Sequence, residues 1–314
     1  MTATLHAPAA AWPHRHLLDT DALSAAELVR ILDLAVEMRE ARVRRRARDL
    51  LERETVGLAF YEASTRTRVS FELAARALGA TVIDLSLAAS STAKGESLVD
   101  TLRTLERTGV ETVILRHSAA GAPYLAARAT GLRIVNAGDG MHAHPTQALA
   151  DALTLREALG GLDGRLVAIV GDVAHSRVAR SNLHALAHLG ARLRVAGPPA
   201  FVAGFETWPG VAVAHTLEAA LRGADAVMAL RIQTERTSGA GSSSLREYIA
   251  GWGLNSARME ALAPGAWLMH PGPTNEGVEI SAELAASARS LIGRQVENGV
   301  PVRMAALALL CGAA

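Results

Sequence analysis

The chain has 314 residues, of which 50% are hydrophobic and 20% are charged, so it can bury a sizeable core in one large domain or two ordinary ones. Its formal net charge of +1 excludes a bulk electrostatic attraction to nucleic acid or to an anionic membrane. The single cysteine, Cys311, excludes an intrachain disulfide and a cysteine-built zinc site, which fits a reducing compartment.

The first 23 residues are interrupted by prolines and charges and contain no continuous apolar run. We therefore expect no signal peptide. No later stretch approaches the length of an apolar membrane span. The default expectation is a soluble, cytoplasmic protein with no membrane partner.

The first predicted helix covers residues 24–38, where Ser24 and Glu27 have the spacing of a capping box. The basic run that follows, residues 39–49, is interpreted as the solvated end of this helix and not as a phosphate-binding arm. Strands and helices then alternate. We expect strands at 55–61, 80–86, 111–118 and 132–138, with helices at 65–78, 97–107 and 120–130.

The alternation continues beyond Pro145, which lies in the first turn of a predicted helix over 145–159. Further strands are expected at 165–172, 191–197, 224–231 and 266–272, and further helices at 178–189, 216–222 and 289–311. This pattern predicts an α/β fold with two doubly wound domains, each with a parallel sheet, and a domain boundary in the helix at Pro145. The Gly/Ser-rich segment 231–253 is long for a loop, and long loops in compact domains are usually functional or disordered.

Unusual polar residues follow the predicted strands, at the point where each strand ends. They are Ser64–Arg68, Arg116, His142–Gln147, Gly171–Arg177, Arg231 and His270–Pro273. Because ligands bind outside the carboxyl ends of strands in open parallel sheets, we expect these residues to converge on one crevice or on two facing ones.

The densest of these groups is the segment "STRTR", Ser64–Arg68, at the start of a predicted helix. A helix start leaves backbone amides unpaired and carries a partial positive charge, so an anion there would find backbone, hydroxyl and arginine donors. The alternative is that Ser64 only caps the helix while Arg66 and Arg68 point to solvent. The density of donors favours a phosphate site.

Two histidines, His142 and His144, lie close together near Asp139 and raise the question of a metal site. Two histidines on a loop without a clear third ligand are weak support for a metal site, so we expect no bound metal. His144 precedes Pro145 at a helix start, where the positive helix end lowers the pKa of a histidine. We therefore prefer a neutral donor to a substrate oxygen over a general base.

The segments "STRTR", "HPTQ" and "HPGP", in this order, resemble the transcarbamoylase family, and "SSTAKGESLVDT" resembles the lysine-bearing loop of its aspartate-specific members. The resemblance covers essentially the whole chain. It implies a carbamoyl-phosphate-binding domain over 1–146, with the C-terminal helix 291–314, and an aspartate-binding domain over 147–290. It also implies a homotrimer whose active sites are shared between subunits.

The family's roles carry over to matching residues. The resemblance implies a carbamoyl phosphate site made by Ser64, Thr65, Arg66, Thr67, Ser90, Lys94, Arg116, His144 and Gln147. It implies an aspartate site made by Lys94, Arg177, Arg231, Gln233, Gly272 and Pro273. The implied catalytic groups are Arg66, Thr67, Lys94, Arg116 and His144, with Ser90 and Lys94 donated by a neighbouring subunit. No protein nucleophile, metal or cofactor is required.

Two positions depart from the family pattern. Glu276 stands where relatives commonly carry a basic residue, and Ala93 where some carry a second lysine. Neither change removes a residue that is assigned to the chemistry. Glu276 alters the local charge near the expected aspartate site.

The resemblance implies transfer of the carbamoyl group of carbamoyl phosphate to L-aspartate, giving N-carbamoyl-L-aspartate and phosphate, the committed step of pyrimidine synthesis. One alternative is an ornithine carbamoyltransferase, whose cationic substrate would call for carboxylates and for "HCLP" in place of "HPGP". Another is a non-catalytic, transcarbamoylase-like subunit, which would be free to lose Arg66, Lys94, Arg116 or His144. The association of the trimers with a regulatory chain or a dihydroorotase stays open.

Overall fold

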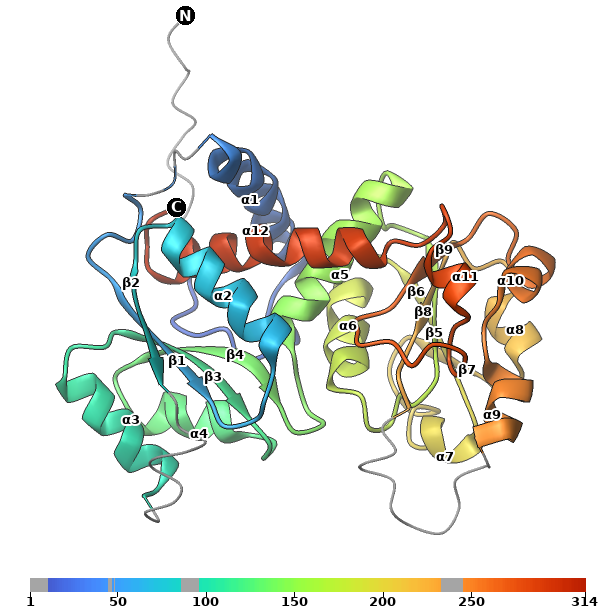
Figure 1. Ribbon diagram of the computed structural model, residues 1–314, viewed down its shortest axis with the longest axis horizontal. Helices are drawn as coiled ribbons and strands as arrows, with labels where there is room; N and C mark the ends of the chain where they lie inside the picture. The colour runs from blue at the N-terminus through green and yellow to red at the C-terminus, as the bar shows by residue number, and fades with distance from the viewer. Residues whose placement is uncertain (1–10, 45–46, 48, 86–95, 233–244) are drawn as a thin grey trace, which may run out of the picture.

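Strand–helix units build two parallel sheets, one from each half of the chain (Figure 1). The computed structural model describes residues 11–44, 47, 49–85, 96–232 and 245–314. The first half contains α1 (Ala25–Val43), β1 (Thr55–Phe60), α2 (Thr65–Ala77), β2 (Thr81–Leu85), α3 (Leu98–Arg107), β3 (Thr112–His117), α4 (Ala122–Ala129) and β4 (Arg133–Asp139). Its strands form a parallel sheet in the order β2-β1-β3-β4.

The second sheet is also parallel, in the order β7-β6-β5-β8-β9. The chain reaches it through α5 (Pro145–Leu159) and continues with β5 (Leu166–Val170), α6 (Arg177–His188), β6 (Arg192–Ala196), α7 (Pro199–Val202), β7 (Val211–Ala214), α8 (Leu217–Leu221) and β8 (Ala226–Ala229). After these come α9 (Leu245–Trp252), α10 (Ser256–Leu262), β9 (Trp267–Met269), α11 (Ala282–Ala285) and α12 (Ile292–Leu310). The two parallel sheets confirm the predicted fold class.

Helices cover both faces of each sheet, because alternate residues of a buried strand point to opposite sides. In β3, Val113 and Leu115 join the apolar cluster under α3 and α4, whereas Ile114 joins the cluster under α1, α2 and α12. In β5, Ile169 faces the side of α6, whereas Val170 faces the side of α8 and α10. This alternation explains why the strands read as near-continuous hydrophobic runs.

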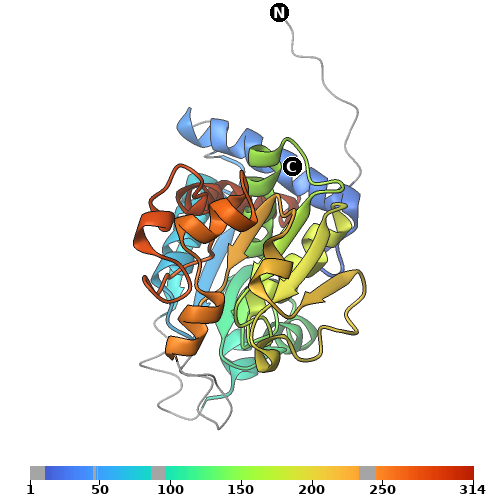
Figure 2. The same cartoon turned by 90° about the vertical axis from the view of Figure 1, so that its right-hand side faces the viewer.

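One hydrophobic core joins the two halves of the molecule. The cluster that contains Ile114 of the first sheet also contains Val167 and Ile169 of the second, together with buried residues of α5, α6 and α12. Helix α12 packs against α1, α2 and α5, so the C-terminal helix returns to the first half, as predicted. Figures 1 and 2 both place the C-terminus beside α1, where Arg30 donates a hydrogen bond of 3.1 Å to the carbonyl oxygen of Ala314.

The predicted strands and longer helices are all present, with ends shifted by a few residues. Five shorter elements were not predicted: β7, α7, α9, α10 and α11. Strand β7 is the edge strand of the second sheet, has four residues and is only partly buried, which leaves a weak hydrophobic pattern. The second sheet therefore has five described strands where about four were expected.

Candidate active site

The carboxyl ends of strands from both sheets open onto one cavity of about 840 Å³. It is lined by the segments that follow β1, β4, β5, β8 and β9, by Arg116 of β3 and by one face of α12. The predicted site residues that it brings together are Ser64, Thr65, Arg66, Thr67, Arg116, His144, Gln147, Arg177, Arg231, Gly272 and Pro273. Ser90, Lys94 and Gln233 lie outside the described residues.

Helix α2 begins at the cavity with an N-terminus that its own side chains do not cap. Ser64 is the N-cap residue, yet its hydroxyl accepts no hydrogen bond from the described first turn. The hydroxyls of Ser24 on α1, Ser97 on α3 and Ser176 on α6 all accept such a bond. A helix start that is left uncapped in a cavity offers its amides and partial positive charge to an anion. This arrangement favours the anion-site interpretation of the segment over simple capping.

The two arginines of this segment face different surroundings. Arg68 forms an ion pair with Asp84 on β2 and does not line the cavity. Arg66 lines the cavity, and a Cβ atom on Gly272 would lie 3.0 Å from its Nη1 atom. Gly272 also has a positive φ of 68°, which suits glycine. The second half of the chain therefore meets the start of α2 through a close backbone approach.

Glu62, just after β1, holds two arginines at the wall of the cavity. Its carboxylate accepts a hydrogen bond of 2.6 Å from Arg116 and two, of 2.6 and 3.0 Å, from Arg177. Burial alone would raise the pKa of Glu62, but the hydrogen bonds and charges of Arg177 and Arg116 outweigh it, and the pKa is lowered. A Cβ atom on Gly138 would lie 3.1 Å from side-chain atoms of both Arg116 and Arg177, so a larger residue at this position would crowd the two arginines.

His144 is the N-cap residue of α5 and is 5% exposed. Its backbone N–H donates to the hydroxyl of Ser181 at 2.9 Å, while its Nδ1 atom has no hydrogen-bond partner among the described residues. Burial, and then the charges of Arg116, Arg177 and Arg303, hold the pKa of His144 well below its usual value. The lowered pKa that the sequence predicted is present, and its main physical cause is burial among arginines.

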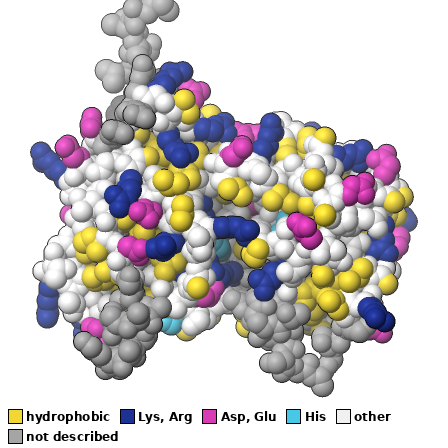
Figure 3. Space-filling view, in the orientation of Figure 1, with side chains coloured by type: hydrophobic (Ala, Val, Ile, Leu, Met, Phe, Trp, Pro, Cys, Tyr) yellow, Lys and Arg dark blue, Asp and Glu magenta, His cyan; other side chains and the backbone are white. Residues whose placement is uncertain are grey.

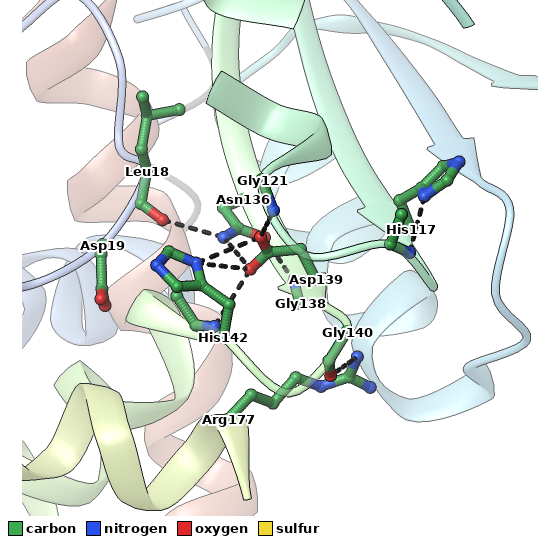
Figure 4. Close-up of polar contacts among 12 residues, drawn as sticks. Leu18, Asp19, His117, Gly121, Asn136, Gly138, Asp139, Gly140, His142 and Arg177 are labelled. Carbon is green, nitrogen blue, oxygen red and sulfur yellow. Dashed lines mark hydrogen bonds and ion pairs between the residues drawn. The ribbon is translucent and has the colours of Figure 1, made fainter. Parts of the chain in front are cut away.

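The turn between β4 and α5, which carries His144, is held together by Asp139 (Figure 4). The buried carboxylate of Asp139 accepts hydrogen bonds from the backbone N–H of Gly121 at 2.7 Å and of Ala143 at 3.0 Å, and from the side chain of Asn136 at 2.8 Å. It also pairs with the His142 ring at 3.1 Å, which raises the pKa of His142. Asp139 and His142, two of the three residues that raised the question of a metal, therefore pair with each other and fix the turn.

The cavity is strongly cationic. Its described lining contains five arginines, Arg66, Arg116, Arg177, Arg231 and Arg303, and one carboxylate, that of Glu62. In the space-filling view, arginine side chains, drawn in dark blue, gather in the hollow between the two halves (Figure 3). Low-dielectric walls and charges of one sign concentrate anionic ligands in such a cleft.

Two of these charged residues were missed by the sequence analysis. Glu62 lies within the segment "FYEASTRTR", and its acidic side chain two residues before Ser64 was the available signal. Arg303 lies on α12, where it is 4% exposed, donates to the Ser70 hydroxyl at 2.9 Å and lies over the Phe71 ring at 4.9 Å. Burial lowers the pKa of Arg303 to about 10. A charged residue inside the apolar run "VPVRMAALALL" was its only signal.

The architecture and the site together define a class of protein: α/β proteins with an arginine-lined cleft between two parallel sheets. Residues 15–157 match the carbamoyl-P binding domain of aspartate/ornithine carbamoyltransferases, and residues 163–310 match the Asp/Orn binding domain. The chain belongs to the aspartate/ornithine carbamoyltransferase family, which confirms the resemblance seen in the sequence.

The similar proteins include bacterial aspartate carbamoyltransferase catalytic subunits. That of Gluconacetobacter diazotrophicus is 51% identical over 297 residues, 94% of this chain and 92% of its own. That of Saccharopolyspora erythraea is 52% identical over 299 residues, 93% of this chain and 96% of its own.

Similar solved structures include an aspartate transcarbamoylase from Trypanosoma cruzi in complex with N-(phosphonacetyl)-L-aspartic acid. Its TM-score is 0.84, its identity is 30%, and the match covers 96% of this chain and 97% of that one. The catalytic subunit of M. jannaschii aspartate transcarbamoylase has a TM-score of 0.80 and 32% identity, and the match covers 95% of this chain and 98% of that one. In the part of the chain that the structure describes, no helix is long and apolar enough to cross a membrane.

Proposed function

We propose that this chain transfers the carbamoyl group of carbamoyl phosphate to the amino group of L-aspartate, giving N-carbamoyl-L-aspartate and phosphate, in de novo pyrimidine biosynthesis. The observation that carries the proposal is a cationic cavity lined by both halves, in which the uncapped start of α2 faces arginines from the second half. The names of the similar proteins, which are aspartate carbamoyltransferases, support the same activity.

The first half of the site suits carbamoyl phosphate. Ser64, Thr65, Arg66 and Thr67 would hold the phosphate at the start of α2, where backbone amides, hydroxyls and a guanidinium meet. Arg116, His144 and Thr67 would donate to the carbamoyl oxygen. Because its pKa is lowered, His144 is neutral near pH 7 and can donate an N–H to that oxygen.

The reaction needs positioning and charge stabilisation and no covalent intermediate with the protein. The amine of aspartate attacks the carbamoyl carbon, a C–N bond forms and the carbonyl oxygen gains negative charge. Arg116 and its neighbours stabilise this oxyanion. The C–O bond to phosphate then breaks, and the departing phosphate, held by Arg66, accepts the proton of the amine. Holding both substrates in one cavity removes much of the entropic cost of their encounter.

The second half of the cavity suits a dicarboxylate. Arg177 and Arg231 would contact the carboxylates of aspartate, with Gln233 as a further contact, and the Gly272–Pro273 turn would place a carbonyl near the reacting amine. Glu62 holds the Arg177 guanidinium at the cavity wall, so the arginine is oriented before substrate arrives. Ornithine would bring a cationic side chain into a lining with five arginines and one described carboxylate, which disfavours it.

The assembly belongs to the same proposal. Residues 1–146 and 291–314 would form the carbamoyl-phosphate-binding domain and residues 147–290 the aspartate-binding domain. The chain would act as a cytoplasmic homotrimer, with Ser90 and Lys94 completing the site of a neighbouring subunit.

A turnover assay with purified protein tests the activity. Carbamoyl phosphate and L-aspartate should give carbamoyl aspartate and phosphate, whereas L-ornithine should give turnover lower by orders of magnitude. Faster product formation from ornithine would overturn the substrate assignment. No product from either amine, with correctly folded protein, would favour the non-catalytic alternative.

A further inference from the structure

A buried carboxylate lies behind the cavity wall, on the helix that begins with His144. Asp151 of α5 is fully buried and does not itself line the cavity. It accepts three hydrogen bonds of 2.8 Å, each from a side-chain amide: Gln147 and Gln295 donate to Oδ1, and Asn182 donates to Oδ2. The donors come from α5, α12 and α6, so one carboxylate gathers three helices.

All three amides turn their nitrogen toward Asp151. An ionised carboxylate only accepts hydrogen bonds, so an amide oxygen placed against it would be repelled. At Asn182 this orientation leaves a buried acceptor unpaired, because the Oδ1 atom has no hydrogen-bond partner among the described residues. The Nδ2 atom of Asn182 donates both to Asp151 and to the Val178 carbonyl oxygen. The pKa of Asp151 is raised, because burial outweighs the opposing effects of the three amide donors and the Arg303 charge. The carboxylate therefore determines which way each amide faces.

For Gln147 this orientation has a consequence in the cavity. Gln147 lines the cavity, and its Nε2 atom is committed to Asp151 at 2.8 Å. Oxygen and nitrogen lie on opposite sides of an amide carbon, so Oε1 is directed away from Asp151 and is the polar atom of this side chain that remains for a ligand. The site thereby presents a hydrogen-bond acceptor at this point, where a freely rotating glutamine could present either a donor or an acceptor.

The same network reaches the second half of the site. The Nε2 atom of Gln295 donates a hydrogen bond to Asp151, and its Oε1 atom accepts one from the backbone N–H of His270, at 2.9 Å between nitrogen and oxygen. The His270 ring accepts the backbone N–H of Gly272 at 2.9 Å and bonds Glu279 at 3.0 Å. A continuous chain of hydrogen bonds therefore runs from Gln147 through Asp151 to the Gly272 turn.

We propose that Asp151 is a positioning residue, which fixes the Gln147 oxygen toward the cavity and so makes the site select acyl phosphates that carry an NH₂ group. The inference rests on the proposed function, since it concerns the acyl donor of that reaction. An NH₂ group donates to Gln147 Oε1, whereas a methyl group in its place covers this acceptor and leaves it unpaired, which costs about 1–3 kcal/mol. Asp151 would then favour carbamoyl over acetyl donors without contacting either donor.

The test uses two stable phosphonates of the same shape, phosphonoacetamide and phosphonoacetone, which differ by NH₂ against CH₃. Their dissociation constants are measured by calorimetry on the wild-type protein and on Asp151→Asn, in which the new amide can donate to Gln147 and allow it to turn. We expect the wild-type protein to prefer the amide about tenfold or more, as one satisfied acceptor predicts. In Asp151→Asn the preference should fall several-fold toward one.

The control is Thr154→Val, a buried position further along α5 whose hydroxyl donates to the Ala150 carbonyl at 2.7 Å and accepts from Asn298 at 3.1 Å. A purely structural loss would weaken both phosphonates equally, so Thr154→Val should keep the wild-type ratio. An unchanged ratio in folded Asp151→Asn would overturn the inference. Equal binding of the two compounds by the wild-type protein would overturn it without any variant, even where Asp151→Asn does not fold.

Wild-type turnover with carbamoyl phosphate and aspartate is measured on the same preparation. Absent turnover would contradict the proposed function, whereas the change in the ratio of phosphonate affinities between wild type and Asp151→Asn tests the positioning role of Asp151. The two failures are therefore distinguishable.

Discussion

At the scale of single residues, the arginines that line the cavity are held in place by neighbouring side chains. Glu62 orients Arg116 and Arg177, and the Ser70 hydroxyl accepts from Arg303. Donors that are fixed in advance need no reorganisation when charge develops. Arg116 and the start of α2 could be predicted from sequence because they stand in motifs at strand ends. Glu62 and Arg303 left only an isolated charge as a signal in the sequence, since their roles depend on contacts that only the folded chain creates.

Arg66 provides the sharpest single substitution. Arg66→Ala should lower kcat by about 10²–10³-fold, because it removes a fixed cation from the departing phosphate. Thermal unfolding should change little, since the side chain is exposed. Arg68→Ala is the matched control, because this neighbour pairs with Asp84 outside the cavity. Near-normal turnover in Arg66→Ala would contradict the phosphate assignment.

His144 predicts a pH dependence of stability. Its pKa in the folded chain is well below the value of 6.5 expected when unfolded, so below pH 6.5 the unfolded chain binds a proton that the folded chain does not. The free energy of unfolding should therefore fall as the pH is lowered from 6.5 toward the folded pKa, by at most about 1.4 kcal/mol per pH unit from this group. Above pH 6.5 the contribution is absent.

Urea unfolding at pH 7.5, 6.5 and 5.5 measures this effect. His144→Gln should lose less stability between pH 6.5 and 5.5 than the wild-type chain does. Thr146→Val, at a buried neighbour that does not titrate, should keep the wild-type dependence. The same pH dependence in His144→Gln and wild type would show that His144 is not held neutral.

At the scale of elements, strand–helix alternation was enough to predict both parallel sheets, because buried parallel strands leave continuous apolar runs. The short pieces were missed for physical reasons. Strand β7 has only four partly buried residues, and α7 and α11 have four residues each, too few for a helical period to show. The sequence also does not predict which helix starts are capped. Ser64 and Ser24 are both N-cap serines, but only the Ser24 hydroxyl accepts a hydrogen bond from the first turn of its helix.

This difference between helix starts is testable. Ser24→Ala should cost about 1 kcal/mol of unfolding free energy, because it removes a capping bond, and should leave turnover unchanged. Ser64→Ala should cost little stability and should raise the KM for carbamoyl phosphate. Denaturation and steady-state kinetics on both variants measure the pair. A stability loss in Ser64→Ala equal to that in Ser24→Ala, with unchanged KM, would return Ser64 to a capping role.

At the scale of the whole molecule, one hydrophobic core and one cavity span the two halves. The Asp151 network and the approach of Gly272 to Arg66 tie the half that would hold carbamoyl phosphate to the half that would hold aspartate. The chain by itself brings eleven of the fourteen predicted site residues to this cavity; the other three are Ser90, Lys94 and Gln233, outside the described residues.

The proposed sharing of sites between subunits gives a test at this scale. Lys94→Ala and Arg66→Ala chains should each be inactive alone. Mixed under conditions that dissociate and reform trimers, they should regain a fraction of the activity, because some sites then receive an intact lysine and an intact arginine. Light scattering and turnover on the mixture measure the effect. Confirmed hybrids without recovery, or a fully active dilute monomer, would contradict the shared site.

The central claim is that one cavity holds the phosphate and the dicarboxylate together, and the most direct measurement is binding of N-(phosphonacetyl)-L-aspartic acid, which joins a phosphonate to aspartate. Calorimetry should give one molecule bound per chain. The affinity should fall at least tenfold in Arg66→Ala, which alters the first half of the site, and in Arg231→Ala, which alters the second. Each variant loses a charge-assisted contact worth about 1.5–3 kcal/mol. Wild-type affinity in either variant would contradict a single site built from both halves.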